Sequence, residues 1–449
     1  MKKSMRIVIE NATIVNEGEQ FIGSVVINGD KIAEVLHKGK RPRRGDLKII
    51  DAQGLYLLPG IIDDHVHFRE PGLTHKGTIY SESRAAAAGG VTSYMEMPNT
   101  VPQTTTLEAL NEKFKIAEKD SAVNYSFYFG ATDNNSNLFP RLNPRKVCGI
   151  KLFMGSSTGN MLVESQEKLA NIFSSATLPI AVHCEDGSII SRNAKDVISQ
   201  EGADPAIKFH PVIRSSEACY RSTKSAIEFA KRYNARLHIM HISTAHELEL
   251  LMSGAAENKN ITAEVTPAHL TFCDKDYETL GARIKCNPAI KSIADRNALR
   301  RAISENRIDV IGTDHAPHSP HDKMGGALKA ASGMPSIQFS LQAMLQLVNE
   351  GVLSIEQLVD KMCHTPAKIF GIYNRGFIRK GYIADFVLVD PNRKKTVTRE
   401  DIVSICGWSP FEGTTFDWSV RQTWVNGECV YKDGTFDDNV RGKALRFVR

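Results

Sequence analysis

An alternation of short apolar runs with helix-like stretches, through the middle of the chain, constrains the fold most. Eight apolar runs have the length of strands, and they occupy residues 59–65, 91–97, 124–130, 147–153, 179–184, 236–242, 261–266 and 308–314. Helical patterns lie between them, at 75–89, 107–119, 165–175, 215–233, 244–253 and 293–305. Strands that alternate with helices form a parallel sheet, and eight such strands close a barrel. We therefore predict an α/β fold with a (β/α)8 TIM barrel over residues 59–371.

Both ends of the chain differ from this middle because they show strand patterns without helices. Residues 5–58 contain several such patterns, and they return at 384–390 and 420–431. Turn residues such as Asn and Gly separate the runs, as in hairpins. We expect residues 1–58 and 372–449 to form together one small β-sandwich domain.

Composition and charge exclude several functional classes. The 449 residues include 56 basic and 51 acidic side chains, for a net charge of +5. A balance this close gives no support to nucleic-acid binding. No apolar run approaches the roughly 18 residues of a membrane span, so we expect no membrane association. The eight cysteines are scattered without a CxxC pair, which is typical of reduced thiols in a cytoplasmic protein.

Chemistry-bearing side chains lie at the carboxyl ends of five predicted strands, where barrel enzymes place their active sites. These residues are His65, His67, Lys151, His183, His241 and Asp314. Residues two apart on a strand share a face, so His65 and His67 point the same way. Imidazole and carboxylate groups are the ligands that zinc prefers. Any one of these histidines fits a packed structural role equally well, but their convergence favours a metal site.

Lys151 is the unusual member of this set, because divalent cations repel an ammonium group. Burial and nearby cations lower the pKa of a lysine and free its amine. The alternative is a barrel lysine that pairs with a carboxylate.

The segment 59–67, Pro-Gly-Ile-Ile-Asp-Asp-His-Val-His, resembles the signature of the amidohydrolase superfamily, and the later strand ends match in order and spacing. This resemblance implies two zinc ions, bridged by a carboxylated Lys151 and a hydroxide. By the same resemblance, His65, His67 and Asp314 would hold the first ion, and His183 and His241 the second. Two metal ions lower the pKa of a bridging water and polarise a substrate carbonyl. Asp314 is also expected to move the proton to the leaving nitrogen.

Three further polar residues follow the predicted strands and indicate an anionic substrate. Arg69 lies two residues beyond His67, Asn99 follows the second strand, and His318 follows the eighth. The arginine fork recognises a carboxylate through paired hydrogen bonds. The alternative is that all three form hydrogen bonds at the barrel rim.

The motifs HFREPG at 67–72, MPNT at 97–100 and TDHAPH at 313–318 resemble the dihydroorotase family over essentially the whole chain. The resemblance implies reversible hydrolysis of the cyclic amide of (S)-dihydroorotate to N-carbamoyl-L-aspartate, in de novo pyrimidine biosynthesis. It also implies that the substrate carboxylate is bound by Arg69, Asn99 and His318, and that Asn287 contacts the ring. Similar proteins form dimers or tetramers, so we expect a homo-oligomer.

Two other hypotheses stay open. Lys-Leu-Phe-Met at 151–154 is similar to hydantoinases, which include dihydropyrimidinases, and to allantoinases. Their substrates lack a ring carboxylate, so a buried Arg69 would be an uncompensated charge. The second hypothesis is a non-catalytic amidohydrolase-like scaffold, which the presence of all six ligand positions disfavours. The segment 155–159 also fits GxSxG, but no helix pattern follows directly, so we interpret it as a loop.

Overall fold

The middle of the chain forms a nearly closed parallel barrel in a computed structural model that describes residues 6–40, 47–155 and 161–449. In sheet order the strands are β6 (Ile61–Val66), β7 (Val91–Glu96), β8 (Asn124–Gly130), β9 (Gly149–Met154), β10 (Ile180–Cys184), β11 (Leu237–Ile239), β12 (Ile261–Val265) and β13 (Val310–Ile311). A parallel bridge between Val66 and His315 brings the first strand beside the chain that leaves the last. The predicted barrel of eight parallel strands is confirmed. Residues 156–160, which hold most of the GxSxG match, lie outside the described residues.

Helices surround the barrel strands, and most begin at a side chain that caps the first turn. The longer helices are α1 (Ile79–Ala88), α2 (Leu107–Asp120), α3 (Gln166–Ser175), α4 (Gly187–Glu201), α6 (Ser216–Tyr233), α10 (Ile293–Ser304) and α11 (Ser340–Asn349). The shorter ones are α5 (His210–Ile213), α7 (Ala245–Leu248), α8 (Pro267–Thr271), α9 (Tyr277–Leu280), α12 (Ile355–Val359) and α13 (Thr365–Phe370). The hydroxyl groups of Thr78, Thr106 and Ser292 accept hydrogen bonds from backbone N–H groups of α1, α2 and α10. Such caps satisfy donors that a helix start leaves unpaired.

Two features of the helical layer differ from the predicted pattern. The helix expected over 244–253 is only four residues long, because the chain after Leu248 continues in turns in which Leu250 donates to Glu247 and Leu251 to Leu248. The longer helices α4 and α11 were not predicted, although Asp186 caps α4 at the backbone N–H groups of Ser188 and Ile189.

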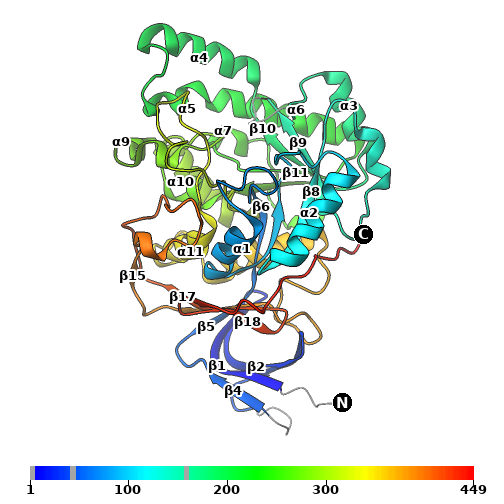
Figure 1. Cartoon of the computed structure of the whole chain (residues 1–449), viewed down its shortest axis with the longest axis vertical. Helices are drawn as coiled ribbons and strands as arrows, with labels where there is room; N and C mark the ends of the chain where they lie inside the picture. Colours follow the sequence, from blue (N-terminus) through cyan, green and yellow to red (C-terminus); the bar gives the residue numbers. More distant parts are fainter. Residues whose placement is uncertain (1–5, 41–46, 156–160) are drawn as a thin grey trace.

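Strands from both ends of the chain form one sheet of nine strands beneath the barrel (Figure 1). They are β1 (Arg6–Asn16), β2 (Glu19–Asn28), β3 (Lys31–His37), β4 (Leu47–Asp51), β5 (Tyr56–Pro59), β14 (Phe386–Asp390), β17 (Ser419–Val425), β18 (Glu428–Lys432) and β19 (Thr435–Phe436). The N- and C-terminal parts meet where β5 pairs with β14, with Leu57 opposite Leu388. Separately, β15 (Lys395–Thr396) pairs with β16 (Thr415–Phe416). The domain limits 1–58, 59–371 and 372–449 stay a prediction.

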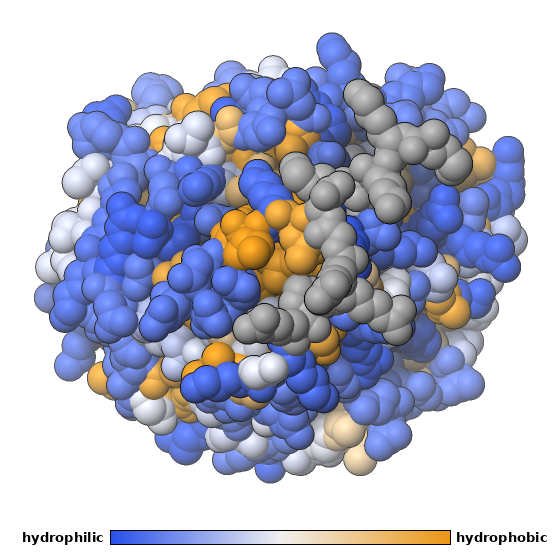
Figure 2. Space-filling model, turned by 90° about the horizontal axis from the view of Figure 1, so that it is seen from below, coloured by the Kyte–Doolittle hydropathy of each residue, from blue (hydrophilic) through white to orange (hydrophobic). Residues whose placement is uncertain are grey.

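Buried polar contacts fix the terminal sheet against the barrel. Asn426 accepts from Arg375 and donates to Asn124 of β8 at 2.9 Å, while its backbone N–H donates to Asp385 at 2.7 Å. From below, the outer face of this end is mostly hydrophilic around a hydrophobic area (Figure 2). Ile22 and Ile49 of this sheet are 46% and 58% exposed. No helix within residues 6–40, 47–155 and 161–449 combines the length and apolar character that a bilayer crossing requires.

Candidate active site

The predicted site residues converge on one hollow at the carboxyl ends of the barrel strands. Its lining consists of His65, His67, Arg69, Asn99, Lys151, Phe153, His183, His241, Asn287, Asp314, Ala316, Ser332 and Gly333. All six predicted metal ligands are therefore brought together, and so are three of the four predicted substrate-binding residues. The fourth, His318, lies directly behind Arg69, with 3.0 Å between its Nε2 and the arginine Nη2.

His65, His67 and Asp314 form a compact group in which each residue offers one atom to a common point. The Nε2 atoms of His65 and His67 lie 3.2 and 3.1 Å from Oδ1 of Asp314. Burial lowers the pKa of both histidines, which favours the neutral imidazole that binds metal. Burial alone would raise the pKa of Asp314, but the adjacent histidines hold it well below its usual value. This donor set fits a divalent cation.

His183, His241 and Lys151 form a second group beside the first. Nδ1 of His183 lies 3.0 Å from Nε2 of His241, and Nε2 of His183 lies 3.0 Å from the Glu185 carboxylate. A proton on the Nε2 of His183 therefore satisfies Glu185 and leaves its Nδ1 lone pair facing the other histidine. Two imidazole nitrogens this close suit a shared cation.

Lys151 lies fully buried among these ligands. Its Nζ lies 2.7 Å from Sδ of Met240, and burial lowers its pKa to about 8. Near neutral pH, a pKa of about 8 leaves a fraction of the amine unprotonated. A neutral amine is the form that can react with carbon dioxide. This contact with a thioether differs from the alternative interpretation of Lys151, in which the lysine pairs with a carboxylate.

Buried carboxylates hold the ligands in place, and the sequence did not single these out. Oε1 of Glu264, on β12, accepts from Nδ1 of His65 at 3.0 Å and from the backbone N–H of His241 at 3.1 Å. Asp63 accepts from the backbone N–H groups of His65 and Thr313, at 3.2 and 3.0 Å. Such contacts orient ligands that would otherwise rotate. The sequence signal that could have identified these carboxylates is an acidic residue within an otherwise apolar strand pattern.

A second group of potential ligands, also missed, lies deeper in the barrel. Asp64, His238 and Glu264 are fully buried, and their ligand atoms lie within 4.8 Å of one another. Because Glu264 belongs to this group and also contacts His65, the group adjoins the first set of candidate ligands.

Three site residues have left-handed backbone conformations that side chains other than glycine seldom adopt. The φ angles are 72° for Arg69, 41° for His241 and 48° for Asp314. Such strain persists only where the surrounding structure imposes it, and it concentrates at functional sites. Each of these residues lies just after a barrel strand, where the chain turns its side chain into the hollow.

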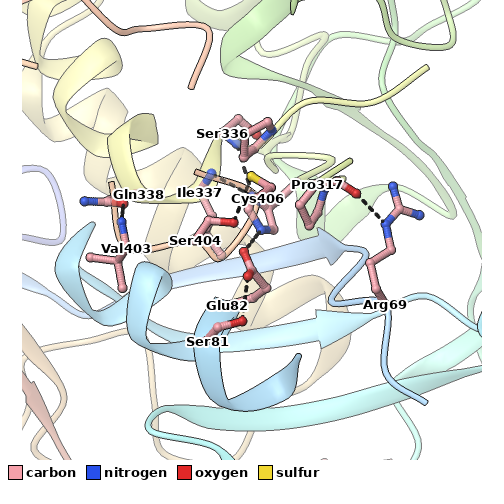
Figure 3. Close-up of polar contacts among 12 residues, drawn as sticks. Arg69, Ser81, Glu82, Pro317, Ser336, Ile337, Gln338, Val403, Ser404 and Cys406 are labelled. Atoms are coloured by element: carbon pink, nitrogen blue, oxygen red, sulfur yellow. Dashed lines mark hydrogen bonds and ion pairs between the residues drawn. The ribbon is translucent and has the colours of Figure 1, made fainter. Parts of the chain in front are cut away.

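The recognition end of the hollow lies around Arg69. Its side chain donates from Nε to the carbonyl of Pro317 at 3.0 Å (Figure 3), and the residue is 7% exposed. Burial lowers its pKa to about 10, so the guanidinium stays charged at neutral pH. Asn287 places a buried Oδ1 in the same hollow without a hydrogen-bond partner among the described residues.

Asn99 takes a position that the sequence did not predict. Its Oδ1 lies 2.8 Å from Nδ1 of His67, where it can accept that imidazole proton. This contact leaves the amide NH2 of Asn99 as its remaining donor. The residue therefore connects a candidate metal ligand with the recognition end.

Known proteins resemble this chain along nearly its whole length. Residues 56–430 match the amidohydrolase family. A dihydroorotase from Halobacterium salinarum is 36% identical over 88% of this chain and 91% of its own length, and an allantoinase from Bacillus velezensis is 30% identical over 95% and 94%. The solved structure of L-hydantoinase (dihydropyrimidinase) from Arthrobacter aurescens superposes with a TM-score of 0.90 at 28% identity, covering 96% of this chain and 97% of that one. The predicted family is confirmed: the chain belongs to the amidohydrolase family.

Proposed function

We propose that this protein is a dihydroorotase, which reversibly hydrolyses the cyclic amide of (S)-dihydroorotate to N-carbamoyl-L-aspartate in de novo pyrimidine biosynthesis. The observation that carries the proposal is the buried guanidinium of Arg69 beside the candidate metal ligands. The guanidinium donates a hydrogen bond to a backbone carbonyl and lies 3.0 Å from Nε2 of His318, and none of its described polar contacts is with a carboxylate. A buried cation of this kind is costly unless an anion joins it. A substrate with a ring carboxylate supplies that anion, whereas allantoin and hydantoin rings do not.

We propose that the ligand set holds two zinc ions. His65, His67 and Asp314 would hold one, His183 and His241 the other, and a carboxylated Lys151 would bridge them. Bound zinc ions would polarise the amide carbonyl and acidify a water between them. The lowered pKa of Lys151, about 8, supports its carboxylation because that reaction requires the neutral amine.

The side chains of this protein then have separate tasks in the proposed reaction. The Asp314 carboxylate accepts the proton of the attacking water and delivers it to the leaving amide nitrogen. The substrate carboxylate is held by Arg69, Asn99 and His318, which fixes the ring against the ligands. Asn287 lies in the same hollow and would contact the ring.

The test is a turnover assay with three ring substrates. The purified protein, supplied with zinc and bicarbonate, is given L-dihydroorotate, allantoin and dihydrouracil, and its bound metal is counted by mass spectrometry. We expect ring opening of L-dihydroorotate far above the other two, with two metal ions per chain. Efficient opening of only a neutral ring would contradict the proposed substrate and leave a metal hydrolase. Sedimentation of the same sample tests the proposed homo-oligomer, a dimer or tetramer.

A further inference from the structure

Both ring nitrogens of His318 have close polar neighbours, and the residue is only 6% exposed. Nδ1 lies 3.2 Å from Nζ of Lys76. Nε2 lies 3.0 Å from the carbonyl oxygen of Ser332 and 3.0 Å from Nη2 of Arg69. A neutral imidazole carries one proton, so these contacts cannot all be hydrogen bonds at once.

The nature of each neighbour decides where the proton resides. The Lys76 ammonium can only donate, so it requires an acceptor at Nδ1. The Ser332 carbonyl can only accept, so it requires a proton on Nε2. These two contacts agree on the tautomer with the proton on Nε2. The contact with Arg69, another pure donor, favours the opposite tautomer. The Asp322 carboxylate also faces Nδ1, but at 3.8 Å it lies farther away than Nζ of Lys76 and beyond hydrogen-bond distance.

The surroundings keep His318 neutral and Lys76 in position. Burial, together with the positive charges of Arg69, Lys76 and Lys323, lowers the pKa of His318 to about 2. Asp322 lies 3.4 Å from Nζ of Lys76, and the backbone N–H of Lys76 donates to Leu73 at 2.9 Å. On the other side, Nε1 of Trp408 donates to the backbone carbonyl of His318 at 2.7 Å.

We propose that Lys76 is a positioning residue that sets His318 in the Nε2–H tautomer for recognition of an anionic ring substituent. In this tautomer, the Nε2–H proton that the Ser332 carbonyl accepts would be shared with a substrate oxygen in a three-centre hydrogen bond, and Nη2 of Arg69 is a second donor 3.0 Å from Nε2. Two neighbouring donors match the two oxygens of a carboxylate. With the proton on Nδ1, the Nε2 lone pair would instead face the carboxylate and repel it. This inference rests on the proposed function, since it explains how the site selects a ring carboxylate.

The direct test reads the tautomer without any substrate. Long-range 1H–15N spectra of histidine-labelled protein distinguish the two tautomers, and His318→Gln identifies the signals of His318. We expect Nε2–H in the wild type and in Lys76→Arg, which keeps a pure donor. We expect a mixture, or the Nδ1–H form, in Lys76→Met and in Lys76→Gln. A wild type with its proton on Nδ1, or an unchanged tautomer in both Lys76→Met and Lys76→Gln, would overturn the proposal.

Kinetics of the same variants supply the second readout. We expect Lys76→Met to raise the KM for L-dihydroorotate about tenfold with kcat within twofold, and Lys76→Arg to restore most of the loss. A general loss of structure would lower the melting temperature and the metal content as well, so both are measured. An Lys76→Arg variant as defective as Lys76→Met would contradict the proposal. A wild type that does not open L-dihydroorotate would contradict the proposed function, whereas the spectra would still decide the role of Lys76.

Discussion

The metal end and the recognition end of the active-site hollow have surroundings of opposite charge. At the metal end, neutral imidazoles project from strand ends and are held by buried carboxylates such as Glu264 and Glu185. At the recognition end, Arg69 and His318 lie on loops among other cations and backbone carbonyls. Nearby carboxylates favour ligands that bind cations, and nearby cationic side chains favour an anionic substrate. We infer that the metal end determines the type of reaction and that the recognition end selects the ring.

Asp314 belongs to the metal end and should show the largest effect. Asp314→Asn keeps the shape of the side chain but removes the charge and the proton acceptor. We expect kcat to fall by about 10³-fold or more, because a positioned acid–base group contributes roughly 10²–10⁴-fold and a metal ligand weakens with it. Steady-state assays with each ring substrate measure this loss. Loss confined to one substrate would place Asp314 at the recognition end instead.

Glu264 tests whether buried carboxylates support the metal end. Glu264→Gln retains an oxygen acceptor for the two N–H groups but removes the carboxylate that would become charged beside a bound cation, and we expect metal to dissociate about 10–100-fold more readily. Metal retained against a chelator series gives the affinity. Lys76→Gln serves as the control, because it changes a charge at the other end and should leave metal retention unaltered. Equal retention in wild type and Glu264→Gln would contradict this role.

Asn99 should affect both ends, since its Oδ1 faces His67 while its amide lies in the hollow. For Asn99→Ala, we expect about tenfold weaker metal retention together with about a tenfold higher KM for L-dihydroorotate. Chelator titration and steady-state kinetics on one preparation measure the two effects. A change in KM alone would separate Asn99 from the metal end.

The recognition end should also respond to acid through two buried histidines beside Asn287. His210 contacts the carbonyl of Cys286 at 2.8 Å and His269 that of Pro288 at 3.1 Å. Burial lowers their pKa values to about 3 and about 4, from 6.5. Between pH 6.5 and 4, these histidines therefore bind protons in the unfolded chain but not in the folded chain. The free energy of unfolding consequently falls as the pH falls. Each histidine contributes up to about 1.4 kcal/mol per pH unit.

Urea unfolding at pH 7 and pH 5 measures this acid sensitivity. The His210→Gln variant keeps a donor for the Cys286 carbonyl but cannot titrate, so its free energy of unfolding should decline less steeply between the two pH values. An identical decline in the wild type and the variant would contradict a neutral, buried His210.

The sequence was sufficient to predict the barrel and the residues that converge in it. Strand patterns and the location of active sites at strand ends predict that His65, Lys151 and Asp314 lie together. Contacts across the barrel could not be predicted from the sequence, because His65 and Glu264 are 199 residues apart and meet only after the sheet closes. Likewise, the contact between Lys76 and His318 joins two loops that no periodicity relates. Local sequence patterns predict helices and strands, whereas the contacts that support the site residues form only when the barrel closes.

The most direct test of the division between the two ends is the substrate selectivity of Arg69→Met. The quantity is the ratio of kcat/KM for L-dihydroorotate to that for dihydrouracil, measured in wild type and variant at equal metal content. We expect this ratio to fall by about 10²-fold or more, because an unpaired charge contact costs roughly 3 kcal/mol, while turnover of the neutral ring is unchanged or improved. A ratio that stays constant while both activities fall together would show that Arg69 serves the chemistry, and would contradict its role in selecting the ring carboxylate.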